Sequence, residues 1–289
     1  MRILILGGDG MLGHQLLKSL QVRHEVKVTL RQEADAYKAY GLFTADNSYF
    51  GLDVRNDGKL IDILTDFRPQ AVINAVGIVK QRQDATSSIQ SIEINSLLPH
   101  KLAMHCSQVG ARLVHMSTDC VFSGRKGGYS EDDEPDALDL YGRSKLLGEV
   151  HDAHAVTLRT SIVGLELARK KSLIEWFLDQ QGEVSGFSRA VYTGFTTQEM
   201  ARIIEKILIE QPELHGVWQV ASQPIDKYTL LRKLQGLLAD GNRSLVKDEK
   251  FVCDRSLVGQ RFNEAVGYRP PSWDVMLDGL AAQIIERGH

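Results

Sequence analysis

The stretch "ILILGGDGMLGHQLLKSL" (residues 3–20) decides the fold class. A short apolar run leads into Gly7, Gly10 and Gly13, spaced G-x-x-G-x-x-G, and then into a segment with helical spacing. Glycine is needed where a turn is tight and where backbone must come close to a ligand. The helix that follows offers unpaired N–H groups and the positive end of its dipole to a pyrophosphate. This order predicts a dinucleotide-binding unit; the alternative is a glycine-rich turn without a ligand.

Further along the chain, apolar runs at 25–30, 71–77, 112–117 and 155–164 alternate with segments of helical spacing. Such runs suit strands buried on both faces, so the pattern predicts an α/β fold with a Rossmann-type, doubly wound parallel sheet. After about residue 165 the pattern becomes mostly helical, with one strand-like run at 216–222 that could return to the first sheet. We therefore expect a dinucleotide-binding domain at 1–165 and a smaller, mixed α/β domain at 166–289.

The composition excludes several classes of protein. With 43% hydrophobic and 25% charged residues, the chain has the balance of an ordinary globular protein. A net charge of −3 provides no field that favours nucleic acid or an anionic membrane. The three cysteines show no metal-ligand spacing, which predicts no metal site and a reducing, cytoplasmic setting. The first apolar run is too short for a membrane helix. For the oligomeric state, we consider a homodimer.

The end of the second predicted strand bears on the choice of cofactor. NAD enzymes of this architecture usually carry an acid there, but this chain has Thr29-Leu30-Arg31. Arg31 could pair with a 2′-phosphate, which favours NADP(H) over NAD(H); the alternative is a solvated surface arginine. After a short third run, Asp53 and Val54 stand where an adenine edge could be read, although an isolated aspartate is more often a turn residue.

Four motifs resemble those of a known family. "GGDGMLG", "NAVG" (74–77), "STDCVFSG" (117–124) and "YGRSK" (141–145) occur in the order seen in extended short-chain dehydrogenase/reductases. Within that family the chain is most similar to the subgroup of dTDP-4-dehydrorhamnose reductases, and "LRTS" (158–161) and "GYRPPSW" (267–273) fit the same subgroup. The resemblance implies an NAD(P)H-dependent reductase of the 4-keto group of a nucleotide-linked 6-deoxyhexose, used in the synthesis of surface polysaccharide.

The resemblance also implies roles for individual residues. The catalytic set would be Thr118, Tyr141 and Lys145, with Asp119 beside the sugar. The residues on the cofactor would be Gly10, Met11 and Leu12 at the pyrophosphate, Asp53 and Val54 at the adenine, and Ala75, Val76 and Gly77 along the adenosine.

One position departs from the pattern of the family. Tryptophan often follows "RTS" and packs against the sugar ring, whereas this chain has Ile162. The departure leaves the sugar open, and "GFSRAVYTGFTT" (186–197) resembles the branch that acts on UDP-linked N-acetylated 6-deoxy sugars. The first alternative is therefore a UDP-2-acetamido-2,6-dideoxyhexos-4-ulose reductase. An epimerase or dehydratase, which shares the fold and the Tyr-x-x-x-Lys pair, and, in another class, a non-catalytic regulatory subunit are further alternatives.

The spacing of Tyr141 and Lys145 suits acid–base chemistry. At i and i+4 of a helix they share one face, and a free tyrosine has a pKa of about 10. A nearby lysine cation favours the phenolate, while Thr118, at the carboxyl end of a predicted strand, could hydrogen-bond a substrate carbonyl. The alternative for the pair is a half-buried structural tyrosine and a solvated lysine. Arg189, expected in a loop, could grip a nucleotide diphosphate or form a surface ion pair.

Overall fold

The computed structural model describes residues 1–79, 87–239, 241 and 243–288. The chain forms two compact units. The first unit contains Met1–Ser117, Leu138–Leu158 and Ala201–Val217, and the second contains Thr118–Ala137, Arg159–Met200 and Trp218–His289.

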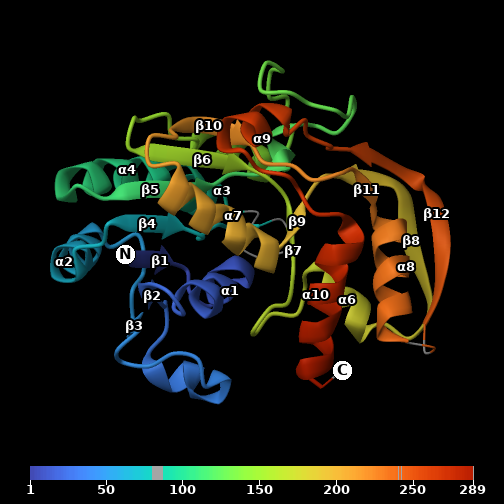
Figure 1. Cartoon of the computed structure of the whole chain (residues 1–289), viewed down its shortest axis with the longest axis horizontal. Helices are drawn as coiled ribbons and strands as arrows, with labels where there is room; N and C mark the ends of the chain where they lie inside the picture. Colours follow the sequence, from blue (N-terminus) through green and yellow to red (C-terminus); the bar gives the residue numbers. More distant parts are fainter. Residues whose placement is uncertain (80–86, 240, 242, 289) are drawn as a thin grey trace. The chain divides into compact units, whose positions relative to one another are not determined.

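A seven-stranded sheet with the strand order β10-β6-β5-β4-β1-β2-β3 is the main sheet (Figure 1). Its strands are β1 (Arg2–Leu6), β2 (Glu25–Thr29), β3 (Ser48–Tyr49), β4 (Ala71–Asn74), β5 (Arg112–Met116), β6 (Ala155–Arg159) and β10 (Gly216–Gln219). The pairs β1–β2, β1–β4, β4–β5 and β5–β6 are all parallel. Every residue of β4 and β6 is buried, as expected for strands covered on both faces. The predicted doubly wound parallel sheet is confirmed.

The chain reverses its direction of winding next to β1, because β2 and β3 lie on one side of it and β4, β5 and β6 on the other. In open parallel sheets, ligands bind outside the carboxyl ends of the strands at such a switch point. The helical segments of this unit are η1 (Ala34–Tyr40), α1 (Met11–Leu20), α2 (Asp57–Phe67), α3 (Ser88–Ser91), the π-helical η3 (Ile92–Leu97), α4 (Leu98–Val109) and α5 (Leu140–Leu147). The helix α7 (Thr197–Glu210) belongs to it mainly through its residues from Ala201 onward.

Two helices and three strands share one apolar core in the first unit. Leu64 of α2 and Leu102 of α4 lie in the same buried cluster as Leu4, Val72 and Leu113 of the sheet. Each of these side chains is at most 1% exposed. Burying a leucine contributes roughly 1.5–3 kcal/mol to the stability of the fold. This cluster therefore holds the sheet together and keeps the ends of its strands in place.

The second unit contains a three-stranded sheet with the order β11-β8-β12. β8 (Gly182–Tyr192) pairs parallel with β12 (Arg243–Asp254) and antiparallel with β11 (Ile225–Asp226), and β7 (Ile162–Val163) pairs with β9 (Phe195–Thr196). Its helical segments are η4 (Asp119–Val121), α6 (Leu173–Asp179), α8 (Lys227–Leu238), α9 (Gln260–Val266) and α10 (Trp273–Glu286). The sequence pattern predicted mostly helices after residue 165, with one strand-like run at 216–222. This prediction is wrong for the segments that form the strands β8 and β12.

The burial of these two strands explains why the sequence pattern missed them. β8 alternates buried and exposed positions, and β12 is exposed over most of its length. A strand that is covered on one face has no continuous apolar run, so it lacks the signal by which the buried strands of the first sheet were recognised. The run at 216–222 does contain a strand, β10. It lies beside β6 and so returns to the first sheet.

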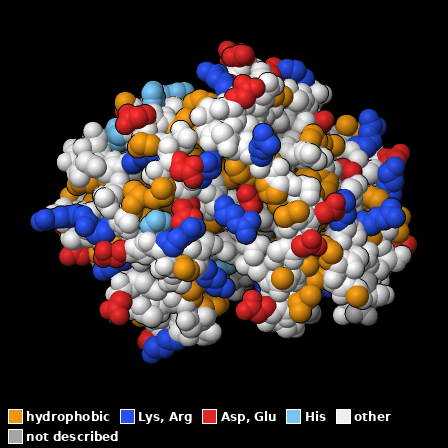
Figure 2. Space-filling view, in the orientation of Figure 1, with side chains coloured by type: hydrophobic (Ala, Val, Ile, Leu, Met, Phe, Trp, Pro, Cys, Tyr) orange, Lys and Arg blue, Asp and Glu red, His pale blue; other side chains and the backbone are white. Residues whose placement is uncertain are grey.

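The surface carries charges of both signs. Lysine, arginine and acidic side chains are interspersed on the face drawn in Figure 2, in keeping with the small net charge. Within the described ranges, no helix has the length and apolar character needed to cross a bilayer.

Candidate active site

The glycine turn joins β1 to α1 through very close backbone contacts. Gly7 has φ +83°, and its carbonyl oxygen accepts a hydrogen bond from the Gly10 N–H at 3.1 Å. A Cβ atom built on Gly13 would lie 2.0 Å from that same oxygen, and one built on Gly8 would lie 2.5 Å from the Val28 Cβ. No larger residue fits at Gly8 or Gly13 unless the backbone moves.

The outer side of this turn is open. A Cβ atom on Gly10 would meet only the Gly7 carbonyl oxygen, at 3.3 Å. Among the described residues, no side chain caps the start of α1 at Gly10, and no acid stands in its first turn. The N–H groups of a helix start and its dipole favour a phosphate group. The turn thus fits a dinucleotide, with Met11 half-exposed and Leu12 buried behind it.

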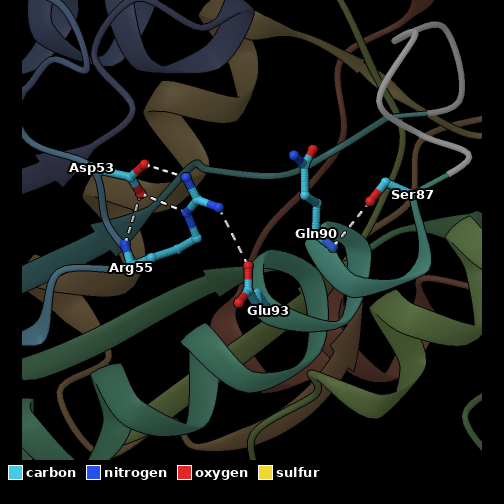
Figure 3. Close-up of polar contacts among 5 residues, drawn as sticks. All are labelled: Asp53, Arg55, Ser87, Gln90 and Glu93. Carbon is cyan, nitrogen blue, oxygen red and sulfur yellow. Dashed lines mark hydrogen bonds and ion pairs between the residues drawn. The ribbon is translucent and has the colours of Figure 1, made fainter.

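Asp53 lies after β3 in a network that the sequence did not reveal. Its carboxylate accepts hydrogen bonds from Arg55 through Nη2 at 2.6 Å, Nε at 2.9 Å and the backbone N–H at 3.0 Å (Figure 3). Arg55 also reaches Glu93 at 3.4 Å. These hydrogen bonds lower the pKa of Asp53 to about 2, so the carboxylate stays charged at neutral pH. Val54 is buried, and Arg31, after β2, is exposed.

Asp53 also has the turn role that was its alternative. Its backbone carbonyl accepts the Asn56 N–H at 2.9 Å, just before α2 begins. The same close-up shows the start of α3, where the Ser87 hydroxyl accepts the Gln90 N–H at 3.5 Å (Figure 3).

The loop after β4, which contains Ala75, Val76 and Gly77, is held by two buried asparagines. Asn74 accepts the Val76 N–H at 3.2 Å through Oδ1, and its Nδ2 lies 3.1 Å from His115 Nδ1. Asn95 bonds both the N–H and the carbonyl of Ile78, at 2.9 and 3.0 Å. Sequence reasoning missed Asn95, which the structure places in a π-helical turn, a feature often found at functional sites.

The helix α5 carries Tyr141 and Lys145. It begins after Asp139, whose side chain accepts the Gly142 N–H at 2.9 Å. Tyr141 is half-buried, whereas Lys145 is only 4% exposed. The Lys145 Nζ donates a hydrogen bond to the carbonyl oxygen of Met116, the last residue of β5, at 2.5 Å. The alternative of a solvated lysine is therefore wrong.

Burial changes the acidity of the Lys145 ammonium. Loss of water lowers its pKa to about 8, and the negative charge of Glu149 opposes this shift. A lysine so placed is charged at neutral pH and loses its proton just above it. Such a cation, one helical turn from a tyrosine, favours the phenolate and is suited to tuning a proton donor.

Thr118 and Asp119 belong to the second unit. The Thr118 hydroxyl caps η4 by accepting the Cys120 N–H at 3.1 Å, and it donates to Asp119 Oδ1 at 3.2 Å. Burial raises the pKa of Asp119, and the positive charge of Arg255 partly offsets this rise. Arg255, which the sequence patterns did not single out, donates through Nε to the Phe122 carbonyl at 2.9 Å.

Two further predicted residues also lie in the second unit. Ile162 is half-buried at the start of β7. Arg189 was expected in a loop, and this is wrong: it stands exposed in β8, paired with Val252 of β12. The alternation of polar and apolar residues in a strand covered on one face resembles a loop composition, which explains the error.

Comparison with known proteins identifies the family. Residues 1–185 match the model of the RmlD substrate binding domain. The chain belongs to this family. That membership confirms the resemblance to extended short-chain dehydrogenase/reductases of the dTDP-4-dehydrorhamnose reductase type.

Individual relatives of this family member are distant. A dTDP-4-dehydrorhamnose reductase of Aggregatibacter actinomycetemcomitans is 27% identical over 241 residues, which are 77% of this chain and 74% of the relative. A methionine adenosyltransferase 2 subunit beta of Bos taurus is 28% identical over 155 residues, 51% of this chain and 41% of the relative. The structure of a dTDP-4-dehydrorhamnose reductase from Bacillus anthracis str. Ames in complex with NADP has a TM-score of 0.77 at 23% identity, covering 98% of this chain and 99% of that one. This last likeness shows the fold.

Proposed function

We propose that the protein is an NADPH-dependent reductase of the 4-keto group of a nucleotide-linked 6-deoxy-4-keto-hexose, of the dTDP-4-dehydrorhamnose type. One observation carries this proposal. Lys145 is buried with its ammonium on the last carbonyl of β5, four residues after Tyr141 on the same helix. Membership of the family over residues 1–185 supports the proposed substrate class.

The residues that would hold the dinucleotide all belong to the first unit. They are Gly7, Gly10, Met11, Leu12, Gly13, Arg31, Asp53, Val54, Ala75, Val76, Gly77, Tyr141 and Lys145. When bound, the reduced nicotinamide supplies the hydride for the carbonyl carbon. The exposed Arg31 supports a preference for NADP(H) over NAD(H), because it can pair with a 2′-phosphate where an acid would repel one.

Tyr141 would act as the general acid that protonates the carbonyl oxygen. The Lys145 ammonium would favour the phenolate that remains and would bond the nicotinamide ribose. The Thr118 hydroxyl, which donates to Asp119 in this structure, would donate to the carbonyl oxygen instead.

The remaining assignments concern the substrate and the setting. Residues 1–165 would form the cofactor domain and residues 166–289 the substrate domain. Asp119, Ile162 and Arg189 would contact the sugar nucleotide, the first two from within residues 1–165. The free thiols of Cys106, Cys120 and Cys253 support a reducing, cytoplasmic compartment. A homodimer and a role in the synthesis of surface polysaccharide complete the proposal.

The test is a panel of dTDP- and UDP-linked 4-keto sugars incubated with NADPH or NADH. We expect oxidation of NADPH in step with conversion of a dTDP sugar, one cofactor per sugar. Conversion without net oxidation would indicate an epimerase or dehydratase. Turnover of no keto sugar, together with stable binding to a larger enzyme, would indicate a regulatory subunit.

A further inference from the structure

A buried acid stands just after α5 and has no part in the mechanism proposed above. Glu149 is only 6% exposed. Its Oε1 accepts a hydrogen bond from the Ser117 hydroxyl at 2.7 Å. Burying a carboxylate is costly unless nearby groups compensate for its charge, so its presence in the interior calls for a reason.

The turn that carries Glu149 is fixed against the neighbouring helical segment. The Gly148 N–H bonds the Lys145 carbonyl at 3.1 Å, and the Glu149 N–H bonds the Leu146 carbonyl at 3.1 Å. A Cβ atom on Gly148 would lie 1.9 Å from the Asn95 carbonyl oxygen, so the backbone lies tight against η3.

Lys145 and Glu149 are directed at consecutive residues of one strand end. The Lys145 Nζ donates to the carbonyl of Met116, and the next residue, Ser117, donates its hydroxyl to Glu149. A cation and an anion from the same turn are thus both anchored where β5 ends.

We propose that Glu149 is a positioning residue whose carboxylate keeps the buried Lys145 ammonium charged and directed at the end of β5. This inference rests on the proposed function, in which that ammonium tunes Tyr141 and bonds the cofactor. It adds a group that acts through Lys145 and touches neither the substrate nor the cofactor.

The electrostatics of the surrounding elements agree with this role. Burial lowers the pKa of Lys145 to about 8, and Glu149 supplies the negative charge that opposes the shift. On β5, the pKa of His115 is lowered well below its usual range, first by burial and then by Lys145, so it stays neutral. Among the described residues, the titratable groups on the elements packed here also include Tyr141 and Arg143 on α5, Glu93 on η3, and His100 on α4, whose Nε2 lies 2.8 Å from the Leu147 carbonyl oxygen.

The first experiment needs neither cofactor nor substrate. It compares the unfolding equilibrium of the wild type and Glu149→Gln from pH 6 to pH 10. The variant keeps the size of the side chain and a hydrogen-bond acceptor for Ser117, but it removes the charge. We expect the pKa of Lys145 to fall by roughly one further unit.

The sign of the effect follows from proton linkage. The folded-state pKa of Lys145 is below the unfolded value in both proteins, and lower in the variant. The variant is therefore less stable than the wild type by the full amount at pH values below both folded-state pKa values of Lys145. Above both values this difference in stability vanishes. One unit corresponds to a change of roughly tenfold in the ratio of the two folding constants across this pH range. In a Lys145→Met background, the pH-dependent part should disappear.

The second experiment measures the affinity for NADPH as a function of pH. In the wild type the affinity should fall as Lys145 loses its proton at alkaline pH, and we call this fall the alkaline limb. In Glu149→Gln the alkaline limb should move to lower pH by roughly one unit. In Glu149→Asp, which keeps the charge, it should stay near the wild-type position. Ser117→Ala is the matched control, because it removes the hydrogen bond and leaves both charges; it should lower stability without moving the limb.

Two outcomes would overturn the inference: an unfolding difference between wild type and Glu149→Gln that does not change with pH, or one that persists unchanged in the Lys145→Met background. Either would give Glu149 a packing role only. Failure of the proposed function would be recognised separately, because the protein would then bind no nicotinamide or reduce no keto sugar while the unfolding result still stood.

Discussion

The glycine turn and α5 contribute to the same unit in opposite ways. The turn works through backbone, since Gly13 and Gly7 approach so closely that even a Cβ atom at Gly13 would lie 2.0 Å from an oxygen. The helix works through side chains, since Tyr141 is half-buried and Lys145 reaches the Met116 carbonyl. Addition of a single methyl group should disrupt the packing of the turn, whereas removal of a single polar atom should abolish the chemistry of the helix. Variants in the two regions should therefore fail differently.

The largest effect is expected from Tyr141→Phe. The variant keeps the ring, the glycine turn and Lys145 and removes only the hydroxyl, so the proton donor is lost while folding and most of the cofactor affinity remain. Turnover should fall by on the order of 10²–10⁴, as when a positioned general acid is removed. Single-turnover hydride transfer, with NADPH affinity measured separately, is the test. A variant that reduces the keto sugar at the wild-type rate would show that α5 contributes no catalytic hydroxyl.

The next effect concerns Gly13→Ala. The added Cβ would meet the Gly7 backbone, which cannot yield as a flexible side chain would, so folding should be destabilised by roughly 1–3 kcal/mol. Urea unfolding measures this loss. Gly10→Ala is the matched control, because its Cβ meets only one atom at 3.3 Å; we expect near-normal stability and weaker cofactor binding. Equal destabilisation by both changes would contradict the distinction between the two sides of the turn.

Arg31→Asp should change the cofactor preference and leave the fold intact. The arginine is exposed, and a charge-assisted contact contributes roughly 1.5–3 kcal/mol, so affinity for NADPH should fall on the order of tenfold or more. Affinity for NADH should hold or improve. Titration of both cofactors by fluorescence measures the ratio, and a wild type that binds the two equally would remove the basis for assigning Arg31 to the 2′-phosphate.

The smallest effect is a dependence of cofactor affinity on pH. The folded-state pKa of Lys145 is about 8, so its ammonium is present below that value and is lost above it. Between pH 7.5 and 8.5 the charged fraction falls roughly threefold, and affinity for NADPH should fall with it. In Lys145→Met the affinity should be weak and flat over this range. A wild type with no decline through pH 8 would mean that the lysine charge does not hold the cofactor.

Some of the candidate site could be predicted because its signals are local. The glycine spacing follows an apolar run directly, and Tyr141 and Lys145 are four residues apart on one helix. Arg55 and Asn95 carried no such signal. Arg55 contacts Asp53 and Glu93, and Asn95 contacts Ile78. Glu93 is far from Arg55 in the sequence, and Ile78 is far from Asn95. Polar residues of this kind are common in loops and on helix surfaces, so composition does not mark them.

The sequence by itself determined the parallel sheet, the glycine turn and the family. The reason is that strands buried on both faces must be apolar throughout and that only glycine permits the closest backbone contacts. Tertiary structure alone decided the half-covered strands β8 and β12, the burial of Lys145 and the place of Glu149. A strand with one exposed face has no continuous apolar run, and the charge state of a lysine depends on the water that its neighbours exclude and on the carboxylate packed nearby.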